Sequence, residues 1–345
     1  MERIDDVKNI YDHLQDETSR FIFGKRLMFS YTQDWRYIYE IVATLPEARW
    51  LNALLEDGEE NFLFCAGIYG RSVYHLAPHA WKGILDNDEA KQGIDWDGVK
   101  ISSPDILRRH PGARVVLATW QLGDTTYCDE ILQQLAMLGV TENRVIRVDK
   151  IMDYIAQTRT YFDLIALPRA SEETFVDVGC YDGGTSVSFA RWAGTFQHIY
   201  AFEPDRANRL RAEVALSRLG HEKYTLIPYG AWSEKAELQF DDSGSVNSCV
   251  SKSGSIRIPV TTIDEELVGE RVTYIKMDIE GSELEALRGA ERTICVQRPK
   301  LAISVYHKPE DIWEIPSYLL SLHSDYCFYL RHYTFSRADT VLYAI

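Results

Sequence analysis

The sequence predicts an α/β protein in which a helical front is followed by two Rossmann-like halves. Two observations predict this fold class. Strands and helices alternate twice along the chain, over residues 58–150 and again from 173. Each alternating stretch begins with a strand that runs into a glycine turn, "FCAGIYG" and "VDVGCYDGG". Alternating strands and helices are typical of a parallel sheet covered by helices.

The first segment, residues 1–57, is predicted to be helical. Apolar residues recur at helical spacing through "IYEIVATLPEARWLNALLED", and Pro46 should break or start a helix there. We expect this segment to serve in packing or in dimerisation. Dimerisation would make the protein a homo-oligomer.

Residues 58–150 are predicted to form a small Rossmann-like module. Its expected strands are "NFLF", "KGILDND", "ARVVLATW" and "RVIRV", and its expected helices are "RSVYHLAP" and "CDEILQQLAMLGV". A helical connector is expected over 151–172.

Residues 173–345 are predicted to form the second α/β domain. The expected main strands are "TFVDV", "HIYAFEPD", "YTLIPYGAW", "VTYIKMDIEG" and "LAISVYH", followed by two more in "YCFYLRHYTF" and "DTVLYAI". A β-rich excursion at 233–260 interrupts the alternation after the third strand.

The composition excludes several classes of protein. The chain of 345 residues has a formal net charge of −15, which disfavours binding to nucleic acid or to an anionic membrane. No apolar run approaches the roughly 20 residues of a membrane span, and no secretory signal is evident. The six cysteines lack the spacing of zinc ligands. We therefore expect a cytoplasmic protein with reduced thiols.

The second glycine turn carries the clearest chemistry. Asp177 and Gly179 end a strand, Asp182 lies in the turn, and Glu203 closes the next strand. Such a layout suits an adenosine ligand whose ribose hydroxyls bind the second-strand acid. Carboxylates at the turn would repel phosphates and favour a cation, such as S-adenosylmethionine.

The stretch "YIKMDIEGSE" at 274–283 places three acids between a strand and a helix. Ser282 and Glu285 are predicted to form a capping box, and Glu283 to be a first-turn acid that the helix dipole favours. Asp278 and Glu280 then remain as candidates for catalysis.

Taken together, "FVDVGCYDGGTS", "YAFEPD", "IPVTTIDEEL" and "YIKMDIEGSELEALRGA" resemble the FkbM-type methyltransferase family. The resemblance covers roughly 174–345. It implies a class I methyltransferase fold, which is a seven-stranded doubly wound sheet whose last strand is antiparallel. It also implies S-adenosylmethionine as cofactor and a hydroxyl as methyl acceptor. Many members carry "DVGAN" in the turn, where this chain has Cys180, Tyr181 and Asp182.

The resemblance also implies roles for single residues. Asp177, Gly179, Tyr181 and Asp182 would line the methionine end of the cofactor, Glu203 would hold the ribose, and Ala231 and Trp232 would lie near the adenine. Asp278 and Glu280 would face the reacting centre.

A hydroxyl acceptor must lose a proton, and His307 after the fifth strand is the candidate base, with His332 as the alternative. Asp278 and Glu280 could instead hold a divalent metal, but the sequence offers no third ligand, so we expect no metal.

The first glycine turn is a weaker indication of a ligand site than the second. Gly67 lies in it, Cys65 stands where a glycine is expected, and Asp86 follows at a spacing that fits a ribose-binding acid. The module looks like the nucleotide-binding front domains of some bacterial sugar acyltransferases. It would recognise a nucleotide-linked sugar, or serve only as a scaffold.

The leading interpretation is an S-adenosylmethionine-dependent O-methyltransferase acting on a sugar, a glycan precursor or a natural product. We expect its acceptor pocket in segments 233–260 and 306–316, where Trp232, Trp313 and Tyr306 could stack on a sugar. One alternative is a dinucleotide-dependent oxidoreductase or epimerase acting on sugars. The other is a non-catalytic assembly protein that binds nucleotide-linked sugars.

Overall fold

The computed structural model describes residues 2–121, 126–240 and 256–345. The chain divides into two compact units. The C-terminal unit comprises Met1–Tyr31, Gln157–Arg331 and Ala338–Ile345, and the N-terminal unit comprises Thr32–Ala156 and His332–Arg337. Sequence motifs predict domain limits at 1–57, 58–150, 151–172 and 173–345. The two units are defined by compactness instead, so these limits stay predictions.

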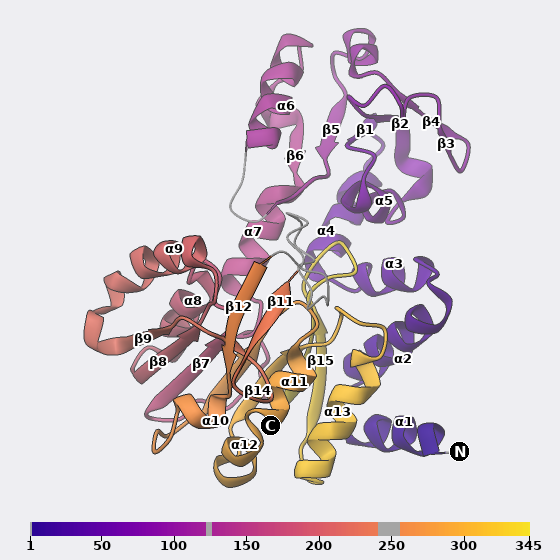
Figure 1. Ribbon diagram of the computed structural model, residues 1–345. Helices are drawn as coiled ribbons and strands as arrows, with labels where there is room; N and C mark the ends of the chain where they lie inside the picture. The colour runs from indigo at the N-terminus through magenta and orange to yellow at the C-terminus, as the bar shows by residue number, and fades with distance from the viewer. Residues whose placement is uncertain (1, 122–125, 241–255) are drawn as a thin grey trace. The chain divides into compact units, whose positions relative to one another are not determined.

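The N-terminal unit is built on a six-stranded sheet. Its strands lie in the order β3-β4-β2-β1-β5-β6 (Figure 1). Neighbouring strands from β4 to β6 are parallel, and β3 is antiparallel to β4. The strands are β1 (Asn61–Phe64), β2 (Trp81–Leu85), β3 (Asp95–Trp96), β4 (Val99–Ser102), β5 (Arg114–Leu117) and β6 (Val145–Arg147). The helices are α3 (Arg36–Val42), α4 (Pro46–Leu55), α5 (Ile68–Tyr74), α6 (Thr126–Met137) and the first part of α7 (Val148–Thr158).

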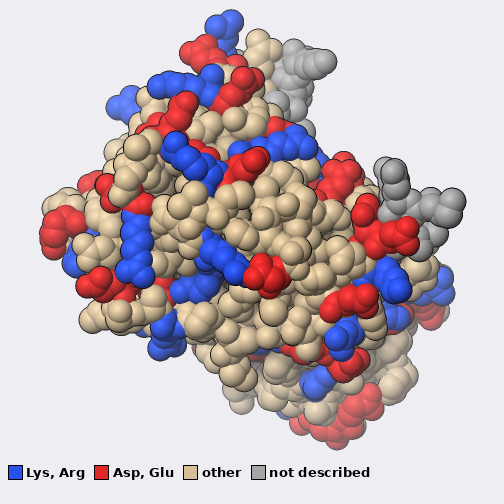
Figure 2. Space-filling model, turned by 90° about the horizontal axis from the view of Figure 1, so that it is seen from below, with Lys and Arg blue, Asp and Glu red and all other residues tan. Residues whose placement is uncertain are grey.

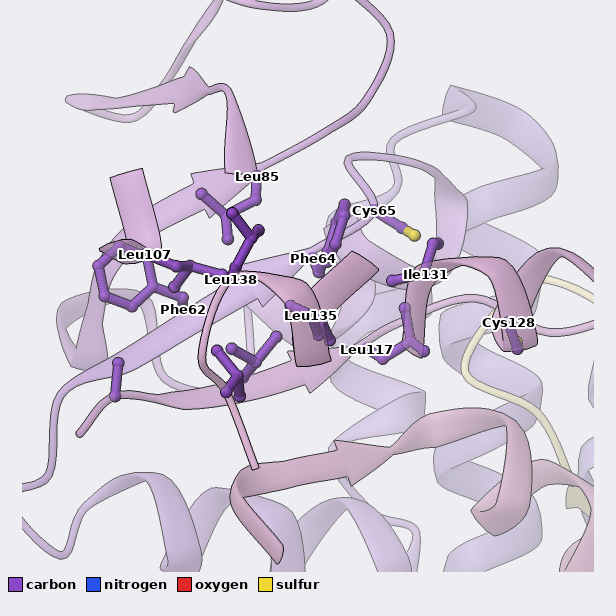
Figure 3. Close-up of a cluster of buried hydrophobic side chains, with 13 residues drawn as sticks. Phe62, Phe64, Cys65, Leu85, Leu107, Leu117, Cys128, Ile131, Leu135 and Leu138 are labelled. Atoms are coloured by element: carbon purple, nitrogen blue, oxygen red, sulfur yellow. The ribbon is translucent and has the colours of Figure 1, made fainter. Parts of the chain in front are cut away.

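Apolar side chains of the sheet and of α6 form the core of this unit. β1 and β5 are buried at every position, as expected for central parallel strands covered on both faces. Figure 3 shows Phe62 and Phe64 of β1 with Leu117 of β5 and, from α6, Ile131 and Leu135. The predicted alternation of strands and helices is therefore confirmed for this unit.

One element of the N-terminal unit was missed. β3 and β4 form a hairpin around Asp97 and Gly98, which have φ of 51° and 93°. Two consecutive left-handed residues are the signature of a type I′ turn, for which Asp-Gly is a preferred sequence. The dipeptide was visible in the sequence, but the flanking strand of two residues was too short to show alternation.

The C-terminal unit holds a seven-stranded sheet in the order β15-β16-β14-β13-β7-β8-β9. The pairs from β14 to β9 are parallel, and β16 is antiparallel to β14. The strands are β7 (Glu173–Val178), β8 (Phe196–Phe202), β9 (Tyr224–Ile227), β13 (Tyr274–Met277), β14 (Lys300–Ser304), β15 (Phe328–His332) and β16 (Thr340–Ala344). This order and polarity confirm the predicted class I methyltransferase fold.

Helices pack around this sheet in two groups. α8 packs against α9 and β7, whereas α13 packs against α1, α11 and α12 (Figure 1). The helices are α1 (Glu2–His13), α2 (Glu17–Thr32), α8 (Gly184–Ala193), α9 (Arg206–Leu216), α10 (Ile263–Glu266), α11 (Glu283–Arg288), α12 (Glu291–Gln297) and α13 (Asp311–Leu322).

The predicted β-rich excursion is a separate three-stranded sheet. Its strands β10 (Gly230–Ala231), β12 (Ile256–Thr261) and β11 (Ala236–Phe240) lie in the order β10-β12-β11. Residues 241–255, which belong to the predicted acceptor pocket, lie outside the described residues.

The predicted helical connector 151–172 is helical only as far as Thr158, where α7 ends. Tyr161 has a φ of 70°, and a left-handed residue cannot continue a right-handed helix. The helix prediction was therefore wrong for the second half of the connector.

The surface charges agree with the expectation from composition. On the face in Figure 2, basic and acidic side chains are interspersed rather than gathered into one basic surface. Among the described residues, the helices are all too short or too polar to cross a bilayer.

Candidate active site

The glycine turn after β7 is held against the end of β13. Gly179 has a φ of 79°, and a Cβ atom at this position would lie 2.2 Å from the carbonyl oxygen of Asp278. Its N–H donates to the carbonyl of Phe202, at the end of β8, over 3.1 Å. Only glycine fits both the left-handed backbone and this close approach.

Asp177 lies at the turn, but its carboxylate faces inward. The side chain is fully buried, with Oδ1 3.1 Å from Lys276 Nζ and Oδ2 accepting from the Ser186 hydroxyl over 2.7 Å. Burial lowers the pKa of Lys276, but the Asp177 and Asp278 carboxylates outweigh it and raise that pKa overall. Lys276 also donates to the Gly179 carbonyl over 2.8 Å, so this ion pair fixes the turn.

Glu203 holds the same turn from the next strand. Its Oε2 accepts the N–H of Tyr181 over 3.0 Å, and its Oε1 accepts the N–H of Asp205 over 2.9 Å. Burial raises the pKa of the Glu203 carboxyl. A carboxylate oxygen accepts more than one bond, so Glu203 retains capacity for ribose hydroxyls.

The other predicted cofactor residues lie in the glycine turn, for Tyr181 and Asp182, and on or next to β10 of the separate three-stranded sheet, for Ala231 and Trp232. Tyr181 has a φ of 51° and an exposed ring, and Asp182 Oδ1 accepts the N–H of Gly184 over 2.9 Å. Ala231 is buried on β10, and the Trp232 N–H donates to Thr261 over 2.8 Å.

Asp278 follows β13 and is bound by two tyrosines. The Tyr161 hydroxyl donates to Oδ2 over 2.9 Å and the Tyr306 hydroxyl to Oδ1 over 3.1 Å. Burial, followed by the charge of Asp278, raises the pKa of both phenols well above the usual value. Both tyrosines therefore stay neutral donors that fix the Asp278 carboxylate in place.

Glu280 is held in a left-handed conformation, with a φ of 55°. Such strain persists only where the surroundings enforce it, and it is often found at functional sites. Burial raises the pKa of the Glu280 carboxyl to about 7, against a lowering by His307. Its side chain is 36% exposed, compared with 23% for Asp278, so it is the more accessible acid of the two.

His307 lies among three acids. Its Nδ1 is 3.0 Å from Glu283 Oε1, and its Nε2 is 3.4 Å from Asp278 Oδ1 and 3.5 Å from Glu280 Oε2. Burial lowers the pKa of His307, but the acids, Glu283 first, outweigh it and raise that pKa to about 9. The imidazole therefore carries a proton at neutral pH.

Glu283 lies in the first turn of α11, as predicted, but the predicted capping box was wrong. Ser282 makes no side-chain capping bond, and Glu285 pairs with Arg288 instead. Glu283 is fully buried, accepts the N–H of Ile279 over 2.8 Å and faces His307. Gly281, with a φ of 89°, turns the chain so that this carboxylate points into the site.

The structure adds residues that sequence reasoning had missed or placed elsewhere. Tyr306 was expected to stack on a sugar, but its hydroxyl binds Asp278 and its ring lies 4.0 Å from that of His307. Asp339 has a φ of 55°, and burial, with the charge of Asp278, raises the pKa of its carboxyl to about 7. Trp313 stacks on Tyr31, with ring centroids 5.6 Å apart. His332, the alternative base, belongs to the other compact unit.

Asp278, Glu283 and His307 place one ligand atom each within 4.8 Å of one another. Of the predicted pair Asp278 and Glu280, only Asp278 belongs to this set, together with Glu283 and His307. The hydroxyls of Tyr161 and Tyr306 donate to Asp278 in the same cluster. The absence of a metal stays a prediction.

The fold and this edge of the sheet define a class I methyltransferase. Residues 177–337 match the family model described as the methyltransferase FkbM domain, so this part of the chain is a methyltransferase domain of the FkbM family. The resemblance inferred from the sequence is thereby confirmed.

The comparison with solved structures shows one methyltransferase of similar fold. The methyltransferase FkbM from Methylobacillus flagellatus is 21% identical over 94% of this chain and 99% of its own, with a TM-score of 0.51. An rRNA methylase from Streptococcus thermophilus is 17% identical over 57% of this chain and 93% of its own, with a TM-score of 0.34. The search of curated proteins gave no match.

Proposed function

We propose that this protein transfers a methyl group from S-adenosylmethionine to a hydroxyl oxygen of a sugar, a glycan precursor or a natural product. One observation carries the proposal. The FkbM-type domain places a strained, accessible carboxylate, Glu280, and a fixed one, Asp278, beside the glycine turn at the carboxyl end of β13.

The residues at this edge fit S-adenosylmethionine. The turn and its neighbours carry the carboxylates of Asp182, Glu203, Asp278 and Glu280, which favour a positively charged ligand. Tyr181 and Asp182 would hold the methionine end beside Gly179, Glu203 the ribose, and Ala231 and Trp232 the adenine. Asp177 would act through Lys276 by fixing the turn. When bound, the cofactor supplies a methyl group on a positively charged sulfur, so its leaving group needs no further activation.

Glu280 is the general base in this proposal, in place of His307. A base works best when its pKa lies near the operating pH, and the pKa of Glu280 is raised to about 7. His307 keeps its proton until about pH 9 and is better suited to hold the carboxylates in position. The role predicted for His307 thus changes from base to electrostatic support.

Asp278 orients the acceptor hydroxyl. Its two hydrogen bonds from tyrosines leave the carboxylate little freedom to turn, and fixed geometry is the main source of rate in a displacement with an activated leaving group.

A methyl-transfer screen tests the proposal. The full-length protein is incubated with labelled S-adenosylmethionine and with sugars, nucleotide-linked sugars or polyhydroxylated natural products. We expect label in at least one acceptor as an acid-stable, base-stable ether. Label in a nitrogen or carbon acceptor only would contradict O-methylation. A thermal shift with NAD and none with S-adenosylhomocysteine would favour the oxidoreductase or epimerase.

A further inference from the structure

The N-terminal unit contains a cavity of about 700 Å³ next to the turn between β1 and α5. Its walls come from the start of α3, from the turn, from α5 and from the β3–β4 hairpin, and they include Tyr39, Gly67, Arg71, His75, Trp96 and Asp97. The volume is in the range of small-molecule sites. Nothing in the methyltransferase proposal uses this cavity.

Asp86, the acid predicted to bind ribose, is not part of the cavity wall. It is buried, with Oδ2 accepting the N–H of Ala66 over 2.8 Å and the Lys91 ammonium over 3.0 Å. Asp86 therefore fixes the turn, and a ligand in the cavity must be recognised by other groups.

Arg71 is one of two arginines in the cavity wall, the other being Arg36. The guanidinium carbon of Arg71 lies 4.4 Å from the centre of the Trp96 ring, and its Nη1 is buried without a hydrogen-bond partner. In the described part of the chain, no carboxylate forms an ion pair with Arg71. A buried donor on an uncompensated charge is costly unless a ligand completes it, and a guanidinium fork suits a phosphate.

Aromatic rings form the rest of the wall. Tyr39 stacks on His75 with ring centroids 4.2 Å apart and planes 19° apart. Burial, followed by Arg71, lowers the pKa of His75, so this ring adds no positive charge at neutral pH. Such rings offer flat apolar faces to a planar ligand, as aromatic residues do in nucleotide-binding proteins.

Two acids, Asp34 and Asp97, also line the cavity. Asp34 is paired with Arg36 through hydrogen bonds of 2.5 to 3.1 Å. Asp97 lies exposed at the hairpin turn, where its carboxylate can accept hydroxyl groups.

We propose that this cavity binds a nucleoside phosphate. Its phosphate would pair with Arg71, its base would stack on the wall that includes Trp96 and Tyr39, and its ribose hydroxyls would bind Asp97. The site requires no residue of the methyltransferase domain, so it stands or fails separately from methyl transfer.

Calorimetric titration of the full-length protein tests this site. The probes are the nucleoside diphosphates UDP, GDP and ADP. Inorganic phosphate and uridine are titrated separately, as the phosphate part and the nucleoside part of such a ligand. We expect saturable binding of at least one nucleoside diphosphate, and at least tenfold weaker binding of either part. Arg71→Gln should weaken nucleotide binding at least tenfold, whereas the matched control Arg108→Gln, at a largely exposed arginine of the same unit, should not change it.

Further variants separate binding from folding. Trp96→Ala should weaken binding and Trp50→Ala, at an exposed tryptophan of α4, should not. If Arg71→Gln strongly lowers the melting temperature, Arg71→Lys is the variant that tests binding. It keeps the positive charge but loses the forked guanidinium, so it should bind nucleotide several-fold more weakly than the wild type. The proposal is overturned if no nucleotide binds, if Arg71→Gln and Arg71→Lys bind like the wild type, or if phosphate binds as tightly as the nucleotides. Binding of S-adenosylhomocysteine should be unchanged in every variant.

Discussion

The two glycine turns of this molecule share one construction. In each, an acid at the end of the next strand is buried and accepts a backbone N–H of the turn. Asp86 binds the N–H of Ala66 in the N-terminal unit, and Glu203 binds the N–H of Tyr181 in the C-terminal unit. The sequence pattern of strand, turn and acid therefore predicts how the turn is held in place. It does not predict which ligand the turn binds.

The difference lies beyond each turn. The C-terminal turn abuts Asp278, with Glu280, Glu283 and His307 around it, so carboxylates outnumber cations. The N-terminal turn is followed by Arg71, which has aromatic neighbours and no paired acid among the described residues. Under the two proposals, the neighbours of the turn favour a cationic ligand in the C-terminal unit and an anionic ligand in the N-terminal unit.

The largest effect is expected from Asp278→Ala. If the acid cluster accounts for the functional difference between the two turns, kcat for methyl transfer should fall by about a thousandfold in this variant. The variant loses a fixed electrostatic contact to the reacting groups. The measurement is kcat on an acceptor found in the screen. Binding of S-adenosylhomocysteine should stay within a few-fold of wild type, and wild-type turnover would remove Asp278 from the mechanism.

A matched pair of glycine variants compares the turns directly. Gly179→Ala should destabilise the protein by about 3 kcal/mol or more, since left-handed strain and a 2.2 Å contact with backbone add up. Gly67→Ala should be nearly neutral, because Gly67 has no positive φ and a Cβ there meets no atom within 4 Å. Thermal melting measures both. Equal melting temperatures would show that the C-terminal turn is not held against β13.

Glu283→Gln tests the buried partner of His307. The variant removes the nearest of the three acids around the buried, protonated His307, which should cost about 3 kcal/mol at pH 7. Glu285→Gln, at an acid of the same helix that pairs with Arg288, should cost less than about 0.5 kcal/mol. Urea unfolding at pH 7 provides the comparison.

The pH dependence of unfolding gives a second readout. The pKa of His307 is raised to about 9 in the folded protein, so the stability that its pairing provides is complete below about pH 6.5 and is lost as the pH rises through 9. That loss should be reduced in Glu283→Gln. An identical pH profile in the variant would refute the pairing.

The smallest expected effect is that of Glu280→Gln, about a hundredfold in kcat. The wild-type rate should rise with pH through about 7, because Glu280 must lose its proton before it can act as a base. The variant should be slow and lack this rise. If the rise survives, the titrating group is another acid, and Asp339 and Asp311, whose pKa values are also raised to about 7, are the candidates.

Much of the fold could be predicted from the sequence because its signals are local. Alternating strands and helices and the "KMDIEGSELEAL" motif were enough to predict the parallel sheet of each unit and the class I methyltransferase fold. The missed β3–β4 hairpin and the early end of α7 depend on a two-residue strand and on one left-handed tyrosine, which leave no periodicity to detect.

The site was predicted less completely, for a different reason. Asp278 and Glu280 follow from their place after a buried strand, but the orientation of Glu283 depends on Gly281 and on a histidine 24 positions away. The Tyr161 contact joins residues 117 positions apart. No spacing rule for helices or strands connects such partners, so only the folded chain shows that they meet.

The most direct test of the central claim is calorimetric titration of the full-length protein with S-adenosylmethionine, S-adenosylhomocysteine and NAD. The account predicts one saturable site for the first two, each excluding the other, with no heat from NAD and with the same affinity in Gly67→Ala. Absence of binding by both S-adenosyl compounds, or displacement of them by NAD, would contradict it.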